Sequence, residues 1–134
     1  WLEFRRVLFR SIKSGEKYFN SNFYPLLDFM PRDEYFELLS NSSTAIFYHY
    51  RQQAMGNIIA LLYMGARVYF SRKSPVYAYC KRVGLNIYNF DSEFNIYKNS
   101  VLEKEKADEN RYILFKIFNQ EQVIETINSL VDEF

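Results

Sequence analysis

Apolar and polar residues follow one another in blocks that predict strands and helices in turn. The run TAIFYHY, residues 44–50, is apolar almost throughout, which is typical of a strand covered by helices on both faces of a sheet. Pro25 lies near the start of another apolar run, where a missing N–H group is tolerated. The four predicted strands are FYPLLDF, TAIFYHY, ARVYFSR and LNIYNF, residues 23–29, 44–50, 66–72 and 85–90.

The segments between these runs carry the start and stop signals of helices. Proline or a small polar residue stands at predicted amino ends, and glycine follows two of the predicted carboxyl ends. A repeated strand–helix order with short connections predicts a parallel sheet with right-handed crossovers. The predicted helices are 30–41 with Pro31 in its first turn, 57–64 before Gly65, and 75–83 with Ser74 as cap, Pro75 in its first turn and Gly84 after it.

The last third of the chain has a helical pattern. Residues 101–110 are rich in charge and are expected to form a loop or a solvated helix start. Two apolar faces with helical spacing come next, and Asn119 with Gln122 has the spacing of a cap between them. The first face is Ile113, Leu114, Ile117 and Phe118, and the second is Val123, Ile124, Ile127, Leu130 and Val131.

The length of 134 residues fits one domain with a substantial core. The chain begins with Trp1, and its opening WLEFRRVLFRS differs in character from the remaining sequence and resembles translated adaptor or vector sequence. We therefore expect residues 1–11 to be a non-native leader and residues 12–134 to form the domain.

Composition and charge exclude several classes of function. Seventeen basic and sixteen acidic residues give a net charge of +1, without the basic excess of a protein that binds nucleic acid. No apolar run approaches the roughly 20 residues that span a bilayer. The single cysteine, Cys80, excludes an internal disulfide framework, and we expect a small buried thiol on a helix.

A polar cluster, HYRQQAMGN at residues 49–57, joins a predicted strand to a predicted helix. In an open parallel sheet, ligands collect beyond the carboxyl ends of the strands, near the point where the strand order reverses. Gly56 allows a ligand to approach the backbone, and Asn57 has the right side chain to cap a helix whose free N–H groups favour an anion. The cluster therefore predicts a phosphate or diphosphate site.

Each side chain of the cluster has two interpretations. Arg51 offers a permanent charge and a fork that matches phosphate oxygens, whereas Gln52 and Gln53 suit sugar hydroxyls or amides. His49 can donate to a phosphate or orient a sugar. Alternatively, Arg51 is a solvated charge, the glutamines are helix formers and His49 is a hydrogen-bonded strand end. On residue types alone the second interpretation is favoured, because polar strand ends are common in α/β domains.

The run AIFYHYRQQAMGNIIALLYMGARVYF, with the preceding PLLDFMPRDEYFELLS, resembles the carboxyl-terminal part of the Fuc4NAc transferase family, glycosyltransferase family 56. The resemblance covers most of residues 12–134, and RQQ-x-x-GN is its most specific part. Members of this family transfer 4-acetamido-4,6-dideoxygalactose from a dTDP-linked donor to a lipid-linked acceptor in the synthesis of enterobacterial common antigen. The resemblance shifts the balance towards a functional role for the polar cluster.

The resemblance implies a two-domain GT-B architecture whose carboxyl-terminal, Rossmann-like half holds the nucleotide-sugar. Residues 12–134 are then a truncated donor-binding domain with carboxyl-terminal helices, and catalytic residues are not identified. Absence of a DxD-like motif implies a metal-independent reaction without a cofactor. The donor-binding candidates carried over are His49, Arg51, Gln52, Gln53, Gly56 and Asn57, with Ser71, Arg72 and Lys73 as second-rank candidates whose alternative is a solvated turn.

Other expectations depend on the same resemblance. Many retaining GT-B enzymes bind the ribose through a glutamate in the helix that corresponds to residues 57–64. In this chain the helix reads NIIALLYM and has no acidic residue, so the sequence leaves the identity of the nucleotide open. The implied location is cytoplasmic and peripheral to the inner face of the membrane, with a lipid-linked acceptor bound by a separate amino-terminal domain. The alternatives are another sugar-nucleotide enzyme of this fold, such as an epimerase, and a non-catalytic α/β interaction domain, which is disfavoured because it would carry an acidic cluster at its strand ends.

A truncated GT-B half would lack strands in the middle of its sheet. In the strand order 3-2-1-4-5-6, the absent strands would lie between residues 23–29 and residues 44–50. Residues 23–29 are then expected to pack directly against 44–50, or the vacant edge is expected to pair with another chain. We also expect residues 12–134 to have no transferase activity alone, because the acceptor site and the catalytic base are missing.

Overall fold

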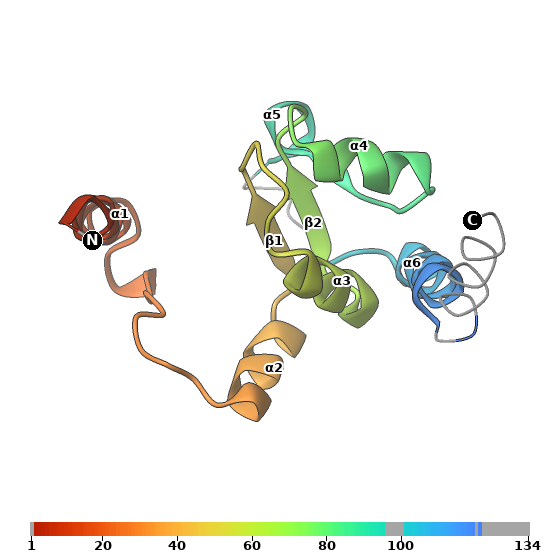
Figure 1. Ribbon diagram of the computed structural model, residues 1–134, viewed down its shortest axis with the longest axis horizontal. Helices are drawn as coiled ribbons and strands as arrows, with labels where there is room; N and C mark the ends of the chain where they lie inside the picture. The colour runs from red at the N-terminus through yellow and green to blue at the C-terminus, as the bar shows by residue number, and fades with distance from the viewer. Residues whose placement is uncertain (1, 96–100, 120, 122–134) are drawn as a thin grey trace, which may run out of the picture. The chain divides into compact units, whose positions relative to one another are not determined.

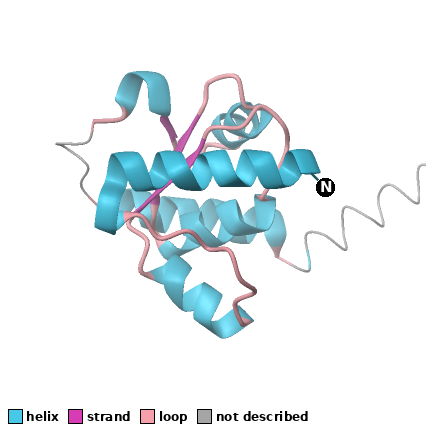
Figure 2. Cartoon of the chain, turned by 90° about the vertical axis from the view of Figure 1, so that its left-hand side faces the viewer, coloured by secondary structure: helices cyan, strands magenta, loops and turns pink. Residues whose placement is uncertain are grey.

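The computed structural model describes residues 2–95, 101–119 and 121 of the chain (Figure 1). Helices make up most of this part, and the strands are short (Figure 2). The chain divides into two compact units, Trp1–Arg32 and Asp33–Phe134. The candidate site residues all belong to the second unit.

The first unit contains α1 (Leu2–Phe19) and a short 3-10 helix, η1 (Asn20–Asn22). Helix α1 crosses the expected leader boundary after residue 11 without a break. After η1 the chain turns back, and the ring of Phe23 packs against Gly15, where a β-carbon would collide with it. Residues 23–31 then continue as a loop.

The predicted strand at residues 23–29 is wrong. These residues pair with no strand in the part of the chain that the structure describes, and most of their apolar side chains are exposed, with Phe29 95% and Tyr24 82% accessible. Pro25 removes one N–H group that a sheet ladder would need. An apolar run of strand length is therefore not enough to form a strand when no neighbouring strand pairs with it.

The second unit holds a three-stranded parallel sheet in the order β1-β2-β3. The α/β class with a parallel sheet is confirmed, but the described sheet contains no reversal of strand order. The strands are shorter than predicted, and the chain leaves the sheet where the hydrogen bonds between neighbouring strands end. The elements of this unit are α2 (Arg32–Ser40, of which Arg32 is the last residue of the first unit), β1 (Thr44–Phe47), α3 (Met55–Met64), β2 (Arg67–Phe70), α4 (Pro75–Arg82), β3 (Tyr88–Asn89), α5 (Phe90–Glu93) and α6 (Lys104–Phe118).

The central strand β2 is buried on both faces. Val68 and Phe70 point into the main core, whose other members include Ile58 and Leu62 of α3 and residues of α4. Tyr69 points the other way and is covered by the rings of Tyr88 and Phe94. Strand β1 differs, because Ile46 is 46% exposed, so the expectation that both faces of this strand are covered is wrong.

Three predicted signals at the ends of α3 and α4 agree with the structure, whereas α2 begins at Arg32, one residue after Pro31. Gly65 after α3 and Gly84 after α4 have φ values of +90° and +87°, the left-handed conformation in which glycine avoids a steric cost. Pro75 occupies the first turn of α4, where no N–H partner is needed. The first apolar face of the tail lies in α6, in which Leu114 is buried, whereas the second predicted face lies outside the described residues.

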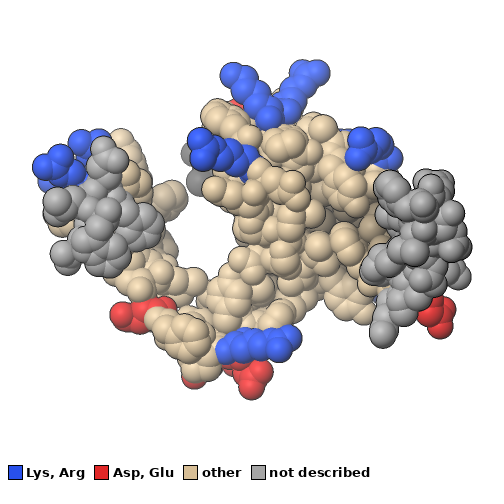
Figure 3. Space-filling view, viewed as in Figure 1, with Lys and Arg blue, Asp and Glu red and all other residues tan. Residues whose placement is uncertain are grey.

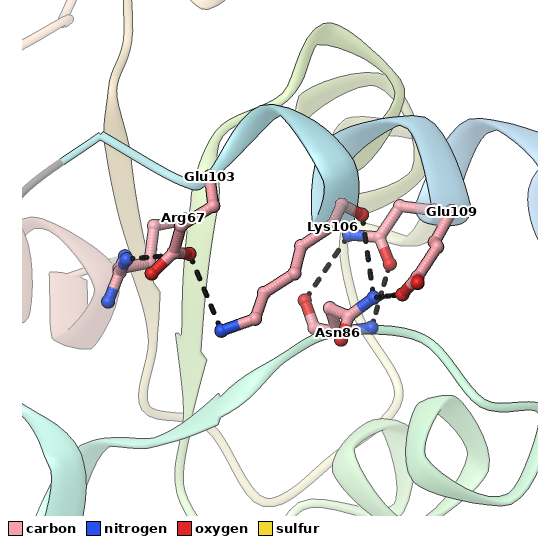
Figure 4. Close-up of polar contacts among 6 residues, drawn as sticks. Arg67, Asn86, Glu103, Lys106 and Glu109 are labelled. Carbon is pink, nitrogen blue, oxygen red and sulfur yellow. Dashed lines mark hydrogen bonds and ion pairs between the residues drawn. The ribbon is translucent and has the colours of Figure 1, made fainter.

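Helix α6 is fixed to the sheet by a polar clamp (Figure 4). Asn110, fully buried, accepts a hydrogen bond from the Asn86 N–H at 2.7 Å and donates to the Asn86 carbonyl at 3.2 Å. The side-chain amide of Asn86 also donates a hydrogen bond to a carboxylate oxygen of Glu109 at 2.9 Å. At the start of the helix, Arg67 of β2 bonds to Glu103 at 3.2 Å. These contacts orient α6 so that its end reaches the carboxyl ends of the strands.

Cys80 lies on α4 and is 1% exposed, which confirms the predicted buried thiol on a helix. Burial raises the pKa of the thiol to about 11, because the apolar surroundings disfavour the thiolate. Burial and a raised pKa both disfavour reaction of this thiol as a nucleophile.

Candidate functional site

The loops that leave the carboxyl ends of the parallel strands gather at one end of the second unit (Figure 1). Residues 48–54 connect β1 to α3, and residues 71–74 connect β2 to α4. The amino ends of both helices therefore lie beside these loops. Free N–H groups in the first turns of the helices make this end electropositive.

His49 lies two residues beyond the end of β1. Its ring packs edge-on against Phe47, with centroids 5.9 Å apart. Both ring nitrogens are buried, and neither has a hydrogen-bond partner among the described residues. The residue is only half-buried as a whole, but a buried ring nitrogen without a partner is costly, since an unsatisfied polar group loses its hydration. The ring is therefore a position where a bound polar ligand would stabilise the protein.

The β1–α3 loop ends in a strained residue. Ala54 has φ +55° and ψ 28°, a left-handed conformation that costs a residue with a β-carbon roughly 1–2 kcal/mol. Helix α3 then begins at Met55, so the prediction that Asn57 caps it is wrong. Asn57 lies in the first turn and is half-buried. The helix has no side-chain cap, which leaves its first N–H groups available to an external acceptor.

The remaining candidates of the polar cluster are accessible. Arg51, Gln52, Gln53 and Gly56 are all exposed. A β-carbon placed on Gly56 meets nothing within 4 Å, so the backbone is open to solvent at this position. The cluster thus brings one guanidinium, two amides and open backbone to the amino end of α3.

The β2–α4 loop contributes a second set of polar groups. Ser71 and Ser74 are each 1% exposed, and the Ser74 hydroxyl has no partner among the described residues although Ser74 occupies the cap position of α4. Arg72 and Lys73 between them are exposed. The Lys73 ammonium lies 6.0 Å from the centre of the Tyr50 ring, which joins this loop to the β1–α3 loop.

A contact between the end of β1 and α5 was not predicted. The Tyr48 hydroxyl donates to a carboxylate oxygen of Asp91 at 2.8 Å, and this bond raises the pKa of Tyr48 to about 12. The side chain of Asn89, at the end of β3, accepts from the Asp91 N–H. Acidic residues therefore do stand at a strand end, but both Asp91 and Glu93 accept hydrogen bonds, Glu93 from the Asn89 N–H. The sequence signal that could have found them is DSE, residues 91–93, directly after the predicted strand at residues 85–90.

A hollow of about 310 Å³ opens between the amino ends of α3 and α4, and we name it the α3–α4 hollow. It is largely apolar, and Phe118 reaches it from the end of α6, far along the sequence. Of the predicted site residues only Gln52 lines it. The lining residues are Gln52, Met55, Pro75, Val76, Tyr79 and Phe118.

Basic side chains predominate over acidic ones at the end of this unit where α4 and α5 lie, at the top of Figure 3. The described residues contain no group of three or more His, Cys, Asp or Glu side chains placed to hold a metal ion. Among the same residues, no helix is both long and apolar enough to cross a membrane. This end therefore presents more exposed positive than negative charge.

In comparisons with known proteins, no family profile, no curated protein and no solved structure matched the chain.

Proposed function

We propose that the carboxyl end of the sheet, between the β1–α3 and β2–α4 loops, binds the diphosphate of a nucleotide-sugar. The protein is then the donor-binding part of an inverting GT-B glycosyltransferase. Its donor is a dTDP-linked 4-acetamido-4,6-dideoxygalactose, and its acceptor is a lipid-linked glycan held by another domain at the cytoplasmic face of the membrane. The sugar, the acceptor and the location depend on the sequence resemblance described above.

The observation that supports the proposal best is the His49 ring. Its two buried nitrogens lack partners among the described residues. They lie at the carboxyl end of a parallel strand, the side of open α/β sheets where ligands bind, although the described sheet has no reversal of strand order. The exposed Arg51 and the uncapped start of α3 are close by in the chain and are suited to anions. A ligand that carries both negative charge and hydrogen-bonding groups would satisfy all three.

The chemistry follows from the charge that builds on the leaving nucleoside diphosphate as the glycosidic bond to the sugar breaks. Arg51 and the N–H groups of the first turn of α3 would stabilise that charge, which lowers the barrier when the donors are held in place beforehand. Gly56 would let a phosphate oxygen approach the backbone. The base that activates the acceptor is outside this set of residues.

The first test compares Arg51→Ala with the unchanged protein by calorimetric titration with dTDP. We expect the variant to bind dTDP roughly 10- to 100-fold more weakly, because a hydrogen bond to a charged group contributes about 1.5–3 kcal/mol. UDP is titrated in parallel to establish which nucleotide is preferred.

Lys104→Ala serves as the matched control. Lys104 is an exposed cation at the start of α6, on the helix end that lies near Arg67 and the beginning of β2. Its removal lowers the net charge by the same amount and should leave dTDP affinity unchanged. Equal affinities of Arg51→Ala and the unchanged protein would contradict the assigned site.

A further inference from the structure

We infer that the α3–α4 hollow receives the flat ring of the ligand, a nucleobase, while the phosphates lie over the strand ends. This inference rests on the proposed function and adds residues that the sequence did not reveal. Tyr79 of α4 and Phe118 of α6 both line the hollow, and they meet there only because α6 packs along α3. Its volume of about 310 Å³ lies at the lower end of the range for small-molecule sites.

The lining decides between a base and a sugar as the occupant. Apart from Gln52 and the Tyr79 hydroxyl, the lining side chains offer no nitrogen or oxygen for hydrogen bonding. A sugar has a hydroxyl or an equivalent polar group on most of its carbons, and each one buried without a partner costs roughly 1–3 kcal/mol. A nucleobase instead presents two apolar faces and confines its polar groups to its edge. The hollow therefore suits a base.

Two features of the hollow match the apolar faces and the polar edge of a nucleobase. Aromatic rings such as Phe118 stack with bases of any sequence, because every base has a π face. The ring of Tyr79 is held from one side by the guanidinium of Arg82, 5.6 Å from its centre. Gln52 presents one amide donor group and one acceptor, which can pair with a neighbouring acceptor and donor on a base edge.

The place of the hollow fits the rest of the ligand. Met55 is the first residue of α3 and Pro75 the first residue of α4, so the hollow lies directly beside two helix amino ends. Phosphates are favoured at such ends. A base in the hollow would therefore leave its phosphates next to Arg51 and the β2–α4 loop.

The test uses calorimetric titration of Phe118→Leu and Tyr79→Leu with two probes, dTDP and inorganic pyrophosphate. Leucine keeps an apolar side chain at each position but removes the ring. Each variant should bind dTDP roughly ten-fold more weakly, as expected for one lost stacking contact. Pyrophosphate affinity should not change, because this probe has no base.

Phe115→Leu is the matched control, since Phe115 is also an exposed phenylalanine of α6. It lines a second hollow, which shares Phe118 with the α3–α4 hollow but includes neither Gln52 nor Tyr79. Unchanged dTDP affinity in both ring variants, with clear dTDP binding by the unchanged protein, would overturn the base site and leave the proposed function intact. Equal weakening of both probes, or of dTDP in Phe115→Leu as well, would also overturn it. If the unchanged protein bound neither probe, the proposed function would fail together with the inference.

Discussion

Asn110→Leu should lower the free energy of unfolding by about 2–4 kcal/mol, because it removes two hydrogen bonds and leaves the Asn86 N–H without its partner. Asn110 is fully buried on α6, and its bonds to the Asn86 backbone join this helix to the segment before β3. Leucine is similar in size to asparagine, so the decrease in the free energy of unfolding reflects the lost polar contacts more than a cavity. Urea unfolding followed by circular dichroism measures it.

Glu109→Gln is the control for this experiment. Glu109 accepts from the Asn86 side chain at the exposed edge of the same clamp, and glutamine retains an acceptor oxygen. Its effect should stay within about 0.5 kcal/mol, as for most surface substitutions. A loss below about 1 kcal/mol for Asn110→Leu would show that the clamp does not fix α6.

The second large effect is a contrast between the two glycines that flank the body of α3. Gly65→Ala should destabilise the protein by about 1–2 kcal/mol, since φ is +90° and a β-carbon would lie only 3.2 Å from the Arg111 guanidinium. Gly56→Ala should stabilise it by up to about 1 kcal/mol, because a β-carbon there meets nothing and alanine favours a helix. Thermal unfolding of both variants measures the contrast.

The same Gly56→Ala variant also tests the site. If a phosphate approaches the backbone at this position, the added methyl group should weaken dTDP binding by about ten-fold, equivalent to one lost charge-assisted hydrogen bond. Gain of stability with loss of affinity is the expected combination. Destabilisation by Gly56→Ala, or a neutral effect of Gly65→Ala, would contradict the backbone geometry given for α3.

Glycine and proline at helix ends were the most predictable part of the fold, whereas neither Asn57 nor Ser74 makes the predicted side-chain cap. Gly65, Pro75 and Gly84 act through local backbone sterics, which depend on a few neighbouring residues and can be read from the sequence. Strands were less predictable, because pairing needs a partner. FYPLLDF has strand composition but no strand beside it among the described residues, whereas the two-residue β3 exists because it pairs with β2.

The site was predictable only in part for a similar reason. The β1–α3 loop is contiguous in the sequence, so His49 to Asn57 could be identified as a polar cluster at a strand end. Phe118 and Tyr79 come from different helices and meet only in the fold, and Asp91 pairs with Tyr48 across the same end of the sheet. The strain at Ala54 is equally hidden, because alanine gives no sequence signal of a left-handed conformation.

The binding of dTDP can be mapped residue by residue from the backbone amide resonances of the isotope-labelled chain during titration. We predict that the shifted amides belong to residues 49–57 and 71–77, the two loops and the first turns of α3 and α4. Shifts confined to the opposite end of the sheet, around Arg67 and residues 101–106, or no saturable shifts at all, would contradict a diphosphate site at the strand ends.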